Sequence, residues 1–293
     1  MRPACGLGYL LARLSDTVAD APDAPIALRR EWLGALRHAF LTGAPITGLD
    51  VALLPSLTDP GERVLVSRTA DCLDAFHSVK GPIREALREV LDAITRGQLL
   101  DLDHVGPLPS EDALIVYADA VAGSVGRFWT RIAHLADPQF AAAPLDAMLA
   151  WGTRYGWALQ WINIVRDLHE DLPRGRSYLP SDPATWIDRA EAGLRDGMRY
   201  TANLRNRRLQ LATVLPALIG AATLRCLRES NGRFLHEKVK VTRSEAGAIV
   251  RGAAWRILLK RPLGPYFETL LQPKSSNAAG TGASNDKGTP VTG

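Results

Sequence analysis

Hydrophobic positions along this chain recur with helical spacing in almost every segment. In residues 26–42, Leu28, Trp32, Leu36 and Phe40 fall on one side of a helix. No stretch shows convincing period-two alternation bounded by hairpin turns. The pattern therefore predicts an all-α fold. The expected helices cover residues 6–20, 26–42, 71–79, 83–103, 111–135, 144–171, 187–211, 213–230, 243–259 and 262–272.

Proline and glycine mark the expected interruptions. Residues 43–61 contain several of both and are predicted to form a loop. The apolar run 209–224 is shorter than the roughly 20 residues that cross a bilayer, so it predicts a buried helix, kinked or interrupted near Pro216. After residue 272 the chain is polar and rich in glycine and serine. We therefore expect one domain over residues 1–272 and a disordered tail over residues 273–293.

Composition and charge change this picture little. A hydrophobic content of 46% and a charged content of 23% are typical of a globular protein with ample core. The net charge of +4 is too mild to indicate nucleic acid, and it suits anionic diphosphates or an anionic membrane surface equally well. Cys5, Cys72 and Cys226 are scattered, which predicts no disulfide framework or metal cluster and fits a reducing cytoplasm. The first apolar run has no cleavage site and is not a signal peptide.

Candidate chemistry lies on the helix expected at 144–171, which is apolar on most sides and polar on one. The polar side chains fall within about one third of the circumference and include no Lys or Arg. They are Gln160, Asn163, Asp167, Glu170 and Asp171. Carboxylates buried without a partner are very costly. Solvent or internal arginines are one kind of partner, and Mg²⁺, which prefers oxygen ligands, is another.

Two further stretches carry polar or small residues in a regular arrangement. Arg13, Asp16 and Asp20 share one face of the helix at 6–20. The helix at 111–135 carries a run of alanine, glycine and serine from Tyr117 to Gly126. Small side chains permit either close helix packing or room for a ligand. A buried Tyr117 has two interpretations, a hydrogen-bonded core residue, which is the commoner case, or a catalytic group.

In combination, these motifs resemble the squalene/phytoene synthase family. The matching segments are DTVAD at 16–20, YADAVAGSVG at 117–126 and ALQWINIVRDLHEDLPRGRSYLP at 158–180, and ITRGQLLDLD at 94–103 is also similar. The resemblance follows the same order over residues 5–260. It implies an isoprenoid synthase fold, in which a single helical bundle surrounds a central apolar cavity.

The resemblance implies head-to-head condensation of two farnesyl diphosphate molecules. One molecule loses diphosphate, the alkene of the second attacks, and proton loss closes the cyclopropane of presqualene diphosphate. A second ionisation followed by hydride transfer from NADPH then gives squalene. The implied Mg²⁺ ligands are Asp16, Asp20, Asp167, Glu170 and Asp171. The four aspartates and Tyr117 form the implied catalytic set, with Tyr117 handling a proton or stabilising a cation.

The same family implies how the substrates are held. The candidate diphosphate-binding residues are Arg13, Gln160, Asn163, Arg166 and Arg176. The candidate prenyl cavity is lined by Val121, Ala122, Gly123, Val125 and Leu159.

The segment VKVTRSEA at 239–246 resembles the part of squalene synthases that contacts the NADPH phosphate. Lys240 and Arg243 would take that role, with Asn163 and Arg176 nearer the nicotinamide, although Thr242 stands where some members have a basic residue. A basic turn before a helix is the simpler interpretation. Phytoene or dehydrosqualene synthesis without NADPH, or a reaction ending at presqualene diphosphate, are the alternatives. Two further alternatives are a terpene cyclase of the same fold and an inactive family member used for binding or assembly.

Two departures from the family pattern affect the predicted site. The chain lacks the Ser-Phe-Tyr-like motif expected upstream of the first aspartate helix, and Ala19 stands where some squalene synthases have a further acid. No C-terminal membrane anchor is recognised. We therefore expect a cytoplasmic protein with peripheral attachment to the inner membrane face through residues 253–267, for which an ordinary surface-packed helix is the alternative. The sequence does not predict prenyl chain length or oligomeric state.

Overall fold

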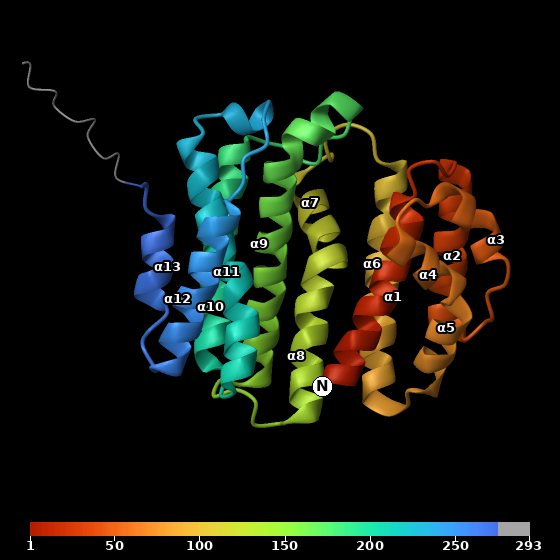
Figure 1. Cartoon of the computed structure of the whole chain (residues 1–293), viewed down its shortest axis with the longest axis horizontal. Coiled ribbons are helices and arrows are strands. Elements are labelled where there is room, and N and C mark those ends of the chain that lie inside the picture. Colours follow the sequence, from red (N-terminus) through yellow and green to blue (C-terminus); the bar gives the residue numbers. More distant parts are fainter. Residues whose placement is uncertain (275–293) are drawn as a thin grey trace, which may run out of the picture.

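Long helices stand side by side and most run from one end of the molecule to the other (Figure 1). This computed structural model describes residues 1–274. Within that range there are two isolated β-bridges and no strand, which confirms the predicted all-α fold. The tail predicted at 273–293 falls almost entirely on residues 275–293, outside the described part.

The N-terminal helices form one group around a shared core. They are α1 (Arg2–Asp20), α2 (Ile26–Thr42), α3 (Leu49–Leu53), the 3₁₀ turn η1 (Leu54–Ser56), α4 (Pro60–Ser67), α5 (Thr69–Ser78) and α6 (Gly81–Asp103). Leu11, Leu33, Phe40 and Leu87 are fully or almost fully buried in this core. Removing such side chains from water is the main force that holds the group together.

The C-terminal helices form a second group around another core. They are α7 (Glu111–Ala118), the π-helical turn η2 (Asp119–Gly123), α8 (Ser124–Ala136), α9 (Leu145–Asp171), η3 (Leu172–Arg174), α10 (Pro183–Asn203), α11 (Arg207–Glu229), η4 (Arg233–Leu235), α12 (Arg243–Leu258) and α13 (Gly264–Leu271). Trp161, Trp186 and Leu218 are buried here. α8 joins the two groups, because Phe128 and Ile132 pack into the N-terminal core.

Glycines allow α8 and α9 to touch backbone to backbone. A Cβ atom on Gly126 would lie 2.1 Å from the carbonyl oxygen of Gly152, and one on Gly156 would lie 2.4 Å from that of Ala122. Both contacts are far shorter than any real Cβ contact, so only glycine fits. On the side that faces α9, the small-residue run after Tyr117 therefore serves close packing.

The predicted loop at 43–61 is partly wrong, because it contains α3, η1 and the start of α4. Asp59 caps α4 by accepting a hydrogen bond from the Glu62 amide at 2.9 Å, and Pro60 fits the first helical turn. The single helix expected at 111–135 is also interrupted, because η2 inserts a π turn between α7 and α8.

The boundary expected between residues 211 and 213 is wrong as well. Asp182 caps α10 by accepting from the Ala184 amide at 2.9 Å, so α10 starts at Pro183. Asn206 caps α11 by accepting from the Arg208 amide at 2.8 Å. These capping side chains satisfy amides that have no partner inside the helix. They move the break to the loop at 204–206.

The apolar helix α11 runs through Pro216 as one continuous helix, so the predicted interruption is absent from this described helix. By length and composition alone, α11 is one described helix that could cross a membrane, a test that soluble core helices also pass. Ala217, Leu218 and Leu224 of α11 are fully buried in the C-terminal core. The prediction of a buried helix is therefore confirmed.

The direction of the helices decides which residues meet. In Figure 1 the C-terminal ends of α1, α6 and α9 lie near the top, together with the start of α7. The N-terminal ends of α1, α6, α9 and α11 and the C-terminal ends of α10 and α12 lie near the bottom. We call these the upper and lower ends. The two predicted acidic motifs belong to the upper end.

Candidate active site

The first acidic motif lies on the last two turns of α1. Gln98 on α6 donates a hydrogen bond from Nε2 to the carboxylate of Asp16 at 2.6 Å. Burial and the charge of the neighbouring Asp20 raise the pKa of Asp16 above its usual value of 3.8. Burial and the charge of Asp101 likewise raise the pKa of Asp20. Three carboxylates from α1 and α6 thus repel one another at the upper end.

Asp101 was not among the predicted site residues, and neither was Tyr178. The Tyr178 hydroxyl donates a hydrogen bond to the Asp101 carboxylate. The Tyr178 ring stacks on Tyr117, with centroids 5.3 Å apart and planes 17° apart. Both missed residues occur inside segments that resemble the family, at 94–103 and 158–180. The sequence therefore contained a signal for them, although not for their contact.

The loop after α9 is fixed against the end of α6 and thereby positions Tyr178. The Gly106 amide donates to the Gly175 carbonyl at 3.2 Å, and His104 Nε2 lies 2.8 Å from the Ser177 carbonyl. Gly175 has a φ of +73°, in the left-handed region that glycine adopts without strain.

Tyr117 on α7 lies between the two acidic motifs. Burial raises the pKa of its hydroxyl well above the usual range, and the negative charges of Asp101, Asp20 and Asp171 act in the same direction. The Tyr117 hydroxyl therefore stays protonated at any physiological pH. Acids from α1, α6 and α9 thus all act on this one hydroxyl.

The second acidic motif, at the end of α9, forms ion pairs with basic side chains. Arg166 donates to both carboxylate oxygens of Asp167, at 2.8 and 2.6 Å. Lys238 Nζ lies 2.6 Å from the Glu170 carboxylate, and His169 Nε2 lies 3.3 Å from it. The predicted stripe without Lys or Arg is thus neutralised in part by one neighbour in sequence and one distant residue.

The other predicted diphosphate ligands differ in how they are placed. Gln160 is half-buried and Asn163 is exposed on α9. Arg176 is half-buried and acts electrostatically on Asp20, while its amide donates to the Asp171 carbonyl at 3.0 Å. Arg13 also acts on Asp20, but its guanidinium is turned to Glu62 on α4, 2.5 Å away.

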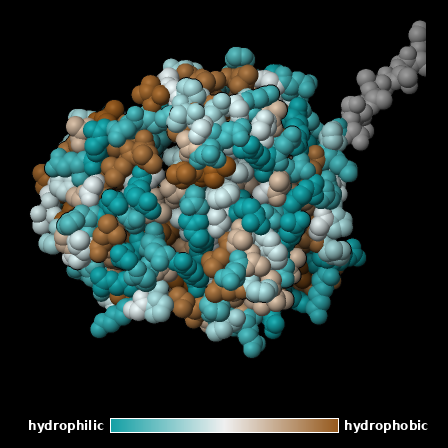
Figure 2. All heavy atoms as spheres, turned by 180° about the vertical axis from the view of Figure 1, so that it is seen from behind, coloured by the Kyte–Doolittle hydropathy of each residue, from teal (hydrophilic) through white to brown (hydrophobic). Residues whose placement is uncertain are grey.

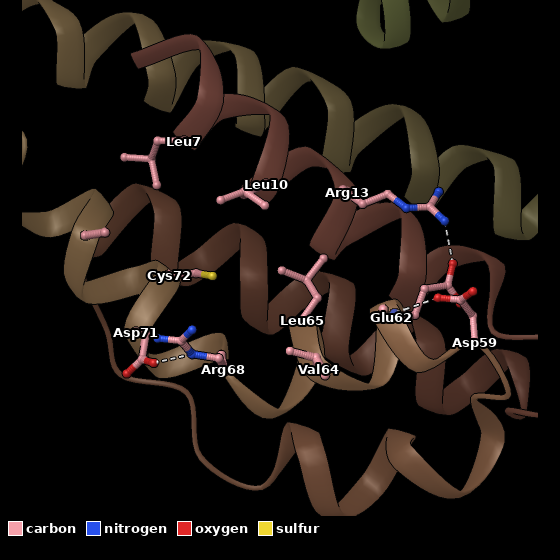
Figure 3. Close-up of a pocket in the computed structure, with 12 residues that line it drawn as sticks. Leu7, Leu10, Arg13, Asp59, Glu62, Val64, Leu65, Arg68, Asp71 and Cys72 are labelled. Carbon is pink, nitrogen blue, oxygen red and sulfur yellow. Dashed lines mark hydrogen bonds and ion pairs between the residues drawn. The ribbon is translucent and has the colours of Figure 1, made fainter. Parts of the chain in front are cut away.

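Figure 3 shows Arg13 at the rim of a pocket between α1, α4 and α5. This pocket has a volume of about 540 Å³ and an apolar wall that includes Leu7, Leu10 and Leu65. Neither acidic motif contributes an aspartate to its lining. Although it is larger than the apolar pocket described next, it is not the candidate active site.

A second pocket, of about 330 Å³, lies between α8, α9, α10 and α11. Val121, Ala122, Val125 and Leu159, four of the five residues predicted to form a prenyl cavity, line it. The fifth residue, Gly123, is not among its lining residues. A Cβ there would lie 2.5 Å from Trp157 Nε1, so Gly123 serves packing against α9. Sequence analysis missed Trp129, Tyr155, Tyr200 and Pro216 as part of this wall.

The predicted NADPH-binding residues lie near the upper end. Lys240 and Arg243 are exposed, in the segment that leads into α12. This segment passes close to the acidic end of α9, because its residue Lys238 pairs with Glu170. Thr242 accepts a hydrogen bond from the Glu245 amide at 3.2 Å and so caps α12. A capping role explains why a threonine, rather than a basic residue, occupies this position.

The described residues suit a Mg²⁺ ion that is bound jointly by protein carboxylates and substrate phosphates, rather than by the protein alone. Within residues 1–274, no group of three or more His, Cys, Asp or Glu side chains is arranged to hold a metal. Mg²⁺ commonly takes one or two carboxylates and fills its shell with water and phosphate oxygens. Asp16 and Asp20 suit that role, because burial and then repulsion by neighbouring acids raise their pKa values, and a bound cation would offset both effects.

Fold and site together define an all-helical protein of the isoprenoid synthase type, with acids at one end of its bundle and an apolar pocket between its helices. A model of the squalene/phytoene synthase family matches residues 1–185 and 183–245. The chain belongs to this family.

Curated relatives share only part of their length with this chain. A bifunctional lycopene cyclase/phytoene synthase of Leptosphaeria maculans is 31% identical over 64% of this chain and 30% of its own length. A presqualene diphosphate synthase of Rhodopseudomonas palustris is 41% identical over 32% of this chain and 31% of its own. The chain thus spans about a third of the length of these relatives.

The fold is also that of solved members. The structure of TcSQS with the ligand BPH1237 superposes with a TM-score of 0.72 at 20% identity, covering 95% of this chain and 86% of that one. At this identity the likeness concerns the fold alone.

Proposed function

We propose that this chain condenses two farnesyl diphosphate molecules head to head and converts the resulting presqualene diphosphate to squalene. The observation that carries the proposal is the placement of Tyr117. It lies among Asp20, Asp101 and Asp171 at the upper end, one turn before Val121 in the apolar pocket. A diphosphate held by the acids through a metal and a prenyl tail in the pocket would meet beside Tyr117.

Bound Mg²⁺ would neutralise the leaving diphosphate and so lower the barrier to ionisation. Asp16 and Asp20 would hold it from α1, and Asp167, Glu170 and Asp171 from α9. The basic partners of the α9 acids then have a second use. Arg166 and Lys238 would shift from carboxylate to diphosphate oxygens as the metal binds, because each guanidinium or ammonium can donate to either. Arg13, Arg176, Gln160 and Asn163 would complete the diphosphate contacts.

Tyr117 supplies a protonated hydroxyl and an aromatic face. Its ring is stacked on Tyr178, so two π faces lie beside the position where a carbocation forms. An aromatic face attracts a cation by roughly 0.5–2 kcal/mol, more where water is excluded. The apolar lining of the pocket would protect the same cation from water.

The reduction step rests on NADPH bound near Lys240 and Arg243, with Asn163 and Arg176 closer to the nicotinamide. The position of these residues supports the assignment, because the segment that carries Lys240 passes beside Glu170. Cytoplasmic location belongs to the same proposal and agrees with three free cysteines.

A second candidate is synthesis of presqualene diphosphate without its reduction. The segment shared with the Rhodopseudomonas enzyme of that name, at 41% identity, favours it. Both candidates share the first condensation, and squalene formation adds loss of the second diphosphate, rearrangement of the skeleton and hydride transfer from NADPH.

Product analysis tests the proposal. The purified chain is incubated with farnesyl diphosphate and Mg²⁺, with and without NADPH, and extracts are examined by gas chromatography and mass spectrometry. We expect squalene only with NADPH and presqualene diphosphate without it. Presqualene diphosphate under both conditions supports the second candidate. Phytoene from geranylgeranyl diphosphate without NADPH contradicts both, and no diphosphate release at all identifies a non-catalytic member.

A further inference from the structure

We propose that the lower end of the bundle binds the surface of an anionic lipid bilayer. The last turn of α12 and the residue that follows it expose three large apolar side chains there. Trp255 is 58% exposed, Leu258 is 61% exposed and Leu259 is 43% exposed. On the face drawn in Figure 2, hydrophobic side chains form patches among hydrophilic ones.

Basic side chains surround this apolar tip. Lys260 and Arg261 follow it directly, and Arg205, Arg207 and Arg208 lie at the start of α11. All five are exposed, and none has an acidic partner within residues 1–274. Most other arginines of the described chain form ion pairs, including Arg195 with Glu268 and Arg228 with Asp188. Unpaired cations are therefore concentrated here.

The two basic groups lie at the same end because α11 and α12 are consecutive, antiparallel and packed together. α11 starts at the lower end and α12 ends there (Figure 1). The apolar tip and the unpaired cations thus share one end of the bundle. The acids of the candidate active site lie at the other.

The chemistry of this surface fits a bilayer better than a protein or a nucleic acid. Tryptophan settles at membrane–water interfaces, and leucines enter the acyl boundary. Lysine and arginine are attracted by anionic headgroups over roughly one Debye length. A nucleic acid would use the cations but would gain nothing from exposed leucines.

The apolar pocket opens toward the same region. Ala212 and Pro216 line it and are exposed on α11. Arg208 lies one turn before Ala212 on the same face of that helix. If the proposed function holds, a water-insoluble product leaves the pocket beside the bilayer. Membrane binding itself does not depend on that function.

Vesicle sedimentation tests the proposal with the unmodified chain. We expect it to pellet with vesicles of phosphatidylcholine and phosphatidylglycerol at low salt, and much less with phosphatidylcholine alone or at high salt. Replacing both Lys260 and Arg261 by glutamine should weaken binding to anionic vesicles roughly 25-fold, about fivefold for each charge. Trp255→Ser with Leu258→Ser should reduce binding to both vesicle types.

Matched controls remove the same kinds of side chain at other places on the surface. Arg68→Gln with Arg233→Gln removes two charges that are paired with Asp71 and Glu237, and Val51→Ser removes an apolar side chain that is 77% exposed on α3. Neither should change vesicle binding. Equal binding by the glutamine variant and the original chain would overturn the proposal. So would a loss of self-association, measured by light scattering, in a serine variant that still binds vesicles. Because the readout is sedimentation, loss of the proposed enzyme activity would not affect it.

Discussion

Asp16 and Asp20 on α1 have no basic side chain in ion-pair contact anywhere in residues 1–274, whereas Asp167 on α9 holds Arg166 and Glu170 holds Lys238. The first pair is stabilised by one neutral donor, Gln98, and burial together with neighbouring acids raises both pKa values. The two motifs have similar residues, but within the described part of the chain only the α9 motif forms ion pairs, while arginines act on Asp20 from a distance.

This difference bears on how a metal–diphosphate complex would bind. At α1 a cation relieves repulsion that already exists, and binding there breaks no ion pair among the described residues, since the competing donor to Asp16 is the neutral Gln98 side chain. At α9 Asp167 and Glu170 are already paired with basic side chains, which the metal must displace and which can then turn to the diphosphate. We therefore expect α1 to anchor the complex and α9 to respond to it.

The largest expected effect is on turnover. Asp20→Asn keeps the size of the side chain and removes a metal-binding charge from α1, so diphosphate release should fall about a thousandfold, or roughly 4 kcal/mol in the barrier. Glu170→Gln on α9 should cost less, because Lys238 already offsets this charge. The measurement is release of diphosphate from farnesyl diphosphate at saturating Mg²⁺.

Asp119→Asn is the matched control for this comparison. Asp119 belongs to η2 but turns to Arg127, at 2.6 and 2.9 Å, and not to the acidic motifs. Its turnover should stay within a few-fold of the original. Equal losses for Asp20→Asn and Glu170→Gln would contradict the anchoring role of α1.

Tyr117→Phe should have the next largest effect. Phenylalanine keeps the stacking on Tyr178 and removes only the hydroxyl, so a proton-handling role predicts a loss of roughly a hundredfold. A role confined to the aromatic face predicts almost no loss. Turnover of this variant, with its melting temperature as a check on folding, distinguishes the two.

For thermal stability we expect the opposite effect: the Asp20→Asn substitution that lowers turnover should stabilise the fold. A carboxyl whose folded pKa is raised binds more protons when folded, so its contribution to stability falls as pH rises from 3.8 to the folded pKa and stays low above it. Asp20→Asn should therefore raise the melting temperature at pH 7, with a gain that shrinks as pH falls toward 4.

For Asp119 the sign is reversed. Burial opposes the effect, but hydrogen bonds from Arg127 and Trp157 hold the pKa of Asp119 below its usual range. Its carboxylate stabilises the fold above pH 3.8, and this contribution is lost as pH falls through the folded pKa. Asp119→Asn should lower stability at pH 7 by about 1 kcal/mol. Melting curves of both variants from pH 4 to 7 that moved in the same direction would contradict this account.

The sequence predicted long helices better than short ones, for physical reasons. α2 matches its predicted bounds, because several turns repeat the apolar spacing and Gly43 ends the helix in the left-handed conformation. α4 has only eight residues, too few to show a period. Its capping residue, Asp59, was a local signal that the abundance of proline and glycine in 43–61 concealed.

The candidate site was predictable as far as local spacing reaches. Both acidic motifs and Tyr117 stand out within single helices. Tyr178 and Asp101 are 77 positions apart, and Lys238 and Glu170 are 68 apart. Such pairs exist only once the bundle has brought the ends of distant helices together. The neutralisation of α9 was therefore not visible along the chain.

The smallest expected effect concerns the magnesium requirement. Lys238 and Glu170 are 52% and 42% exposed, so their ion pair contributes at most about 1 kcal/mol. Lys238→Met should remove one partner of Glu170 and lower the Mg²⁺ concentration for half-maximal turnover by two- to threefold, because that contribution sets the upper limit of the gain. Arg233→Met, which breaks a comparable exposed pair with Glu237, should leave the requirement unchanged. A higher Mg²⁺ requirement in Lys238→Met would show instead that the contact of Lys238 with the diphosphate outweighs the cost of displacing Lys238 from Glu170. The two motifs would then be neutralised by different cations, a metal on α1 and an ammonium group beside α9.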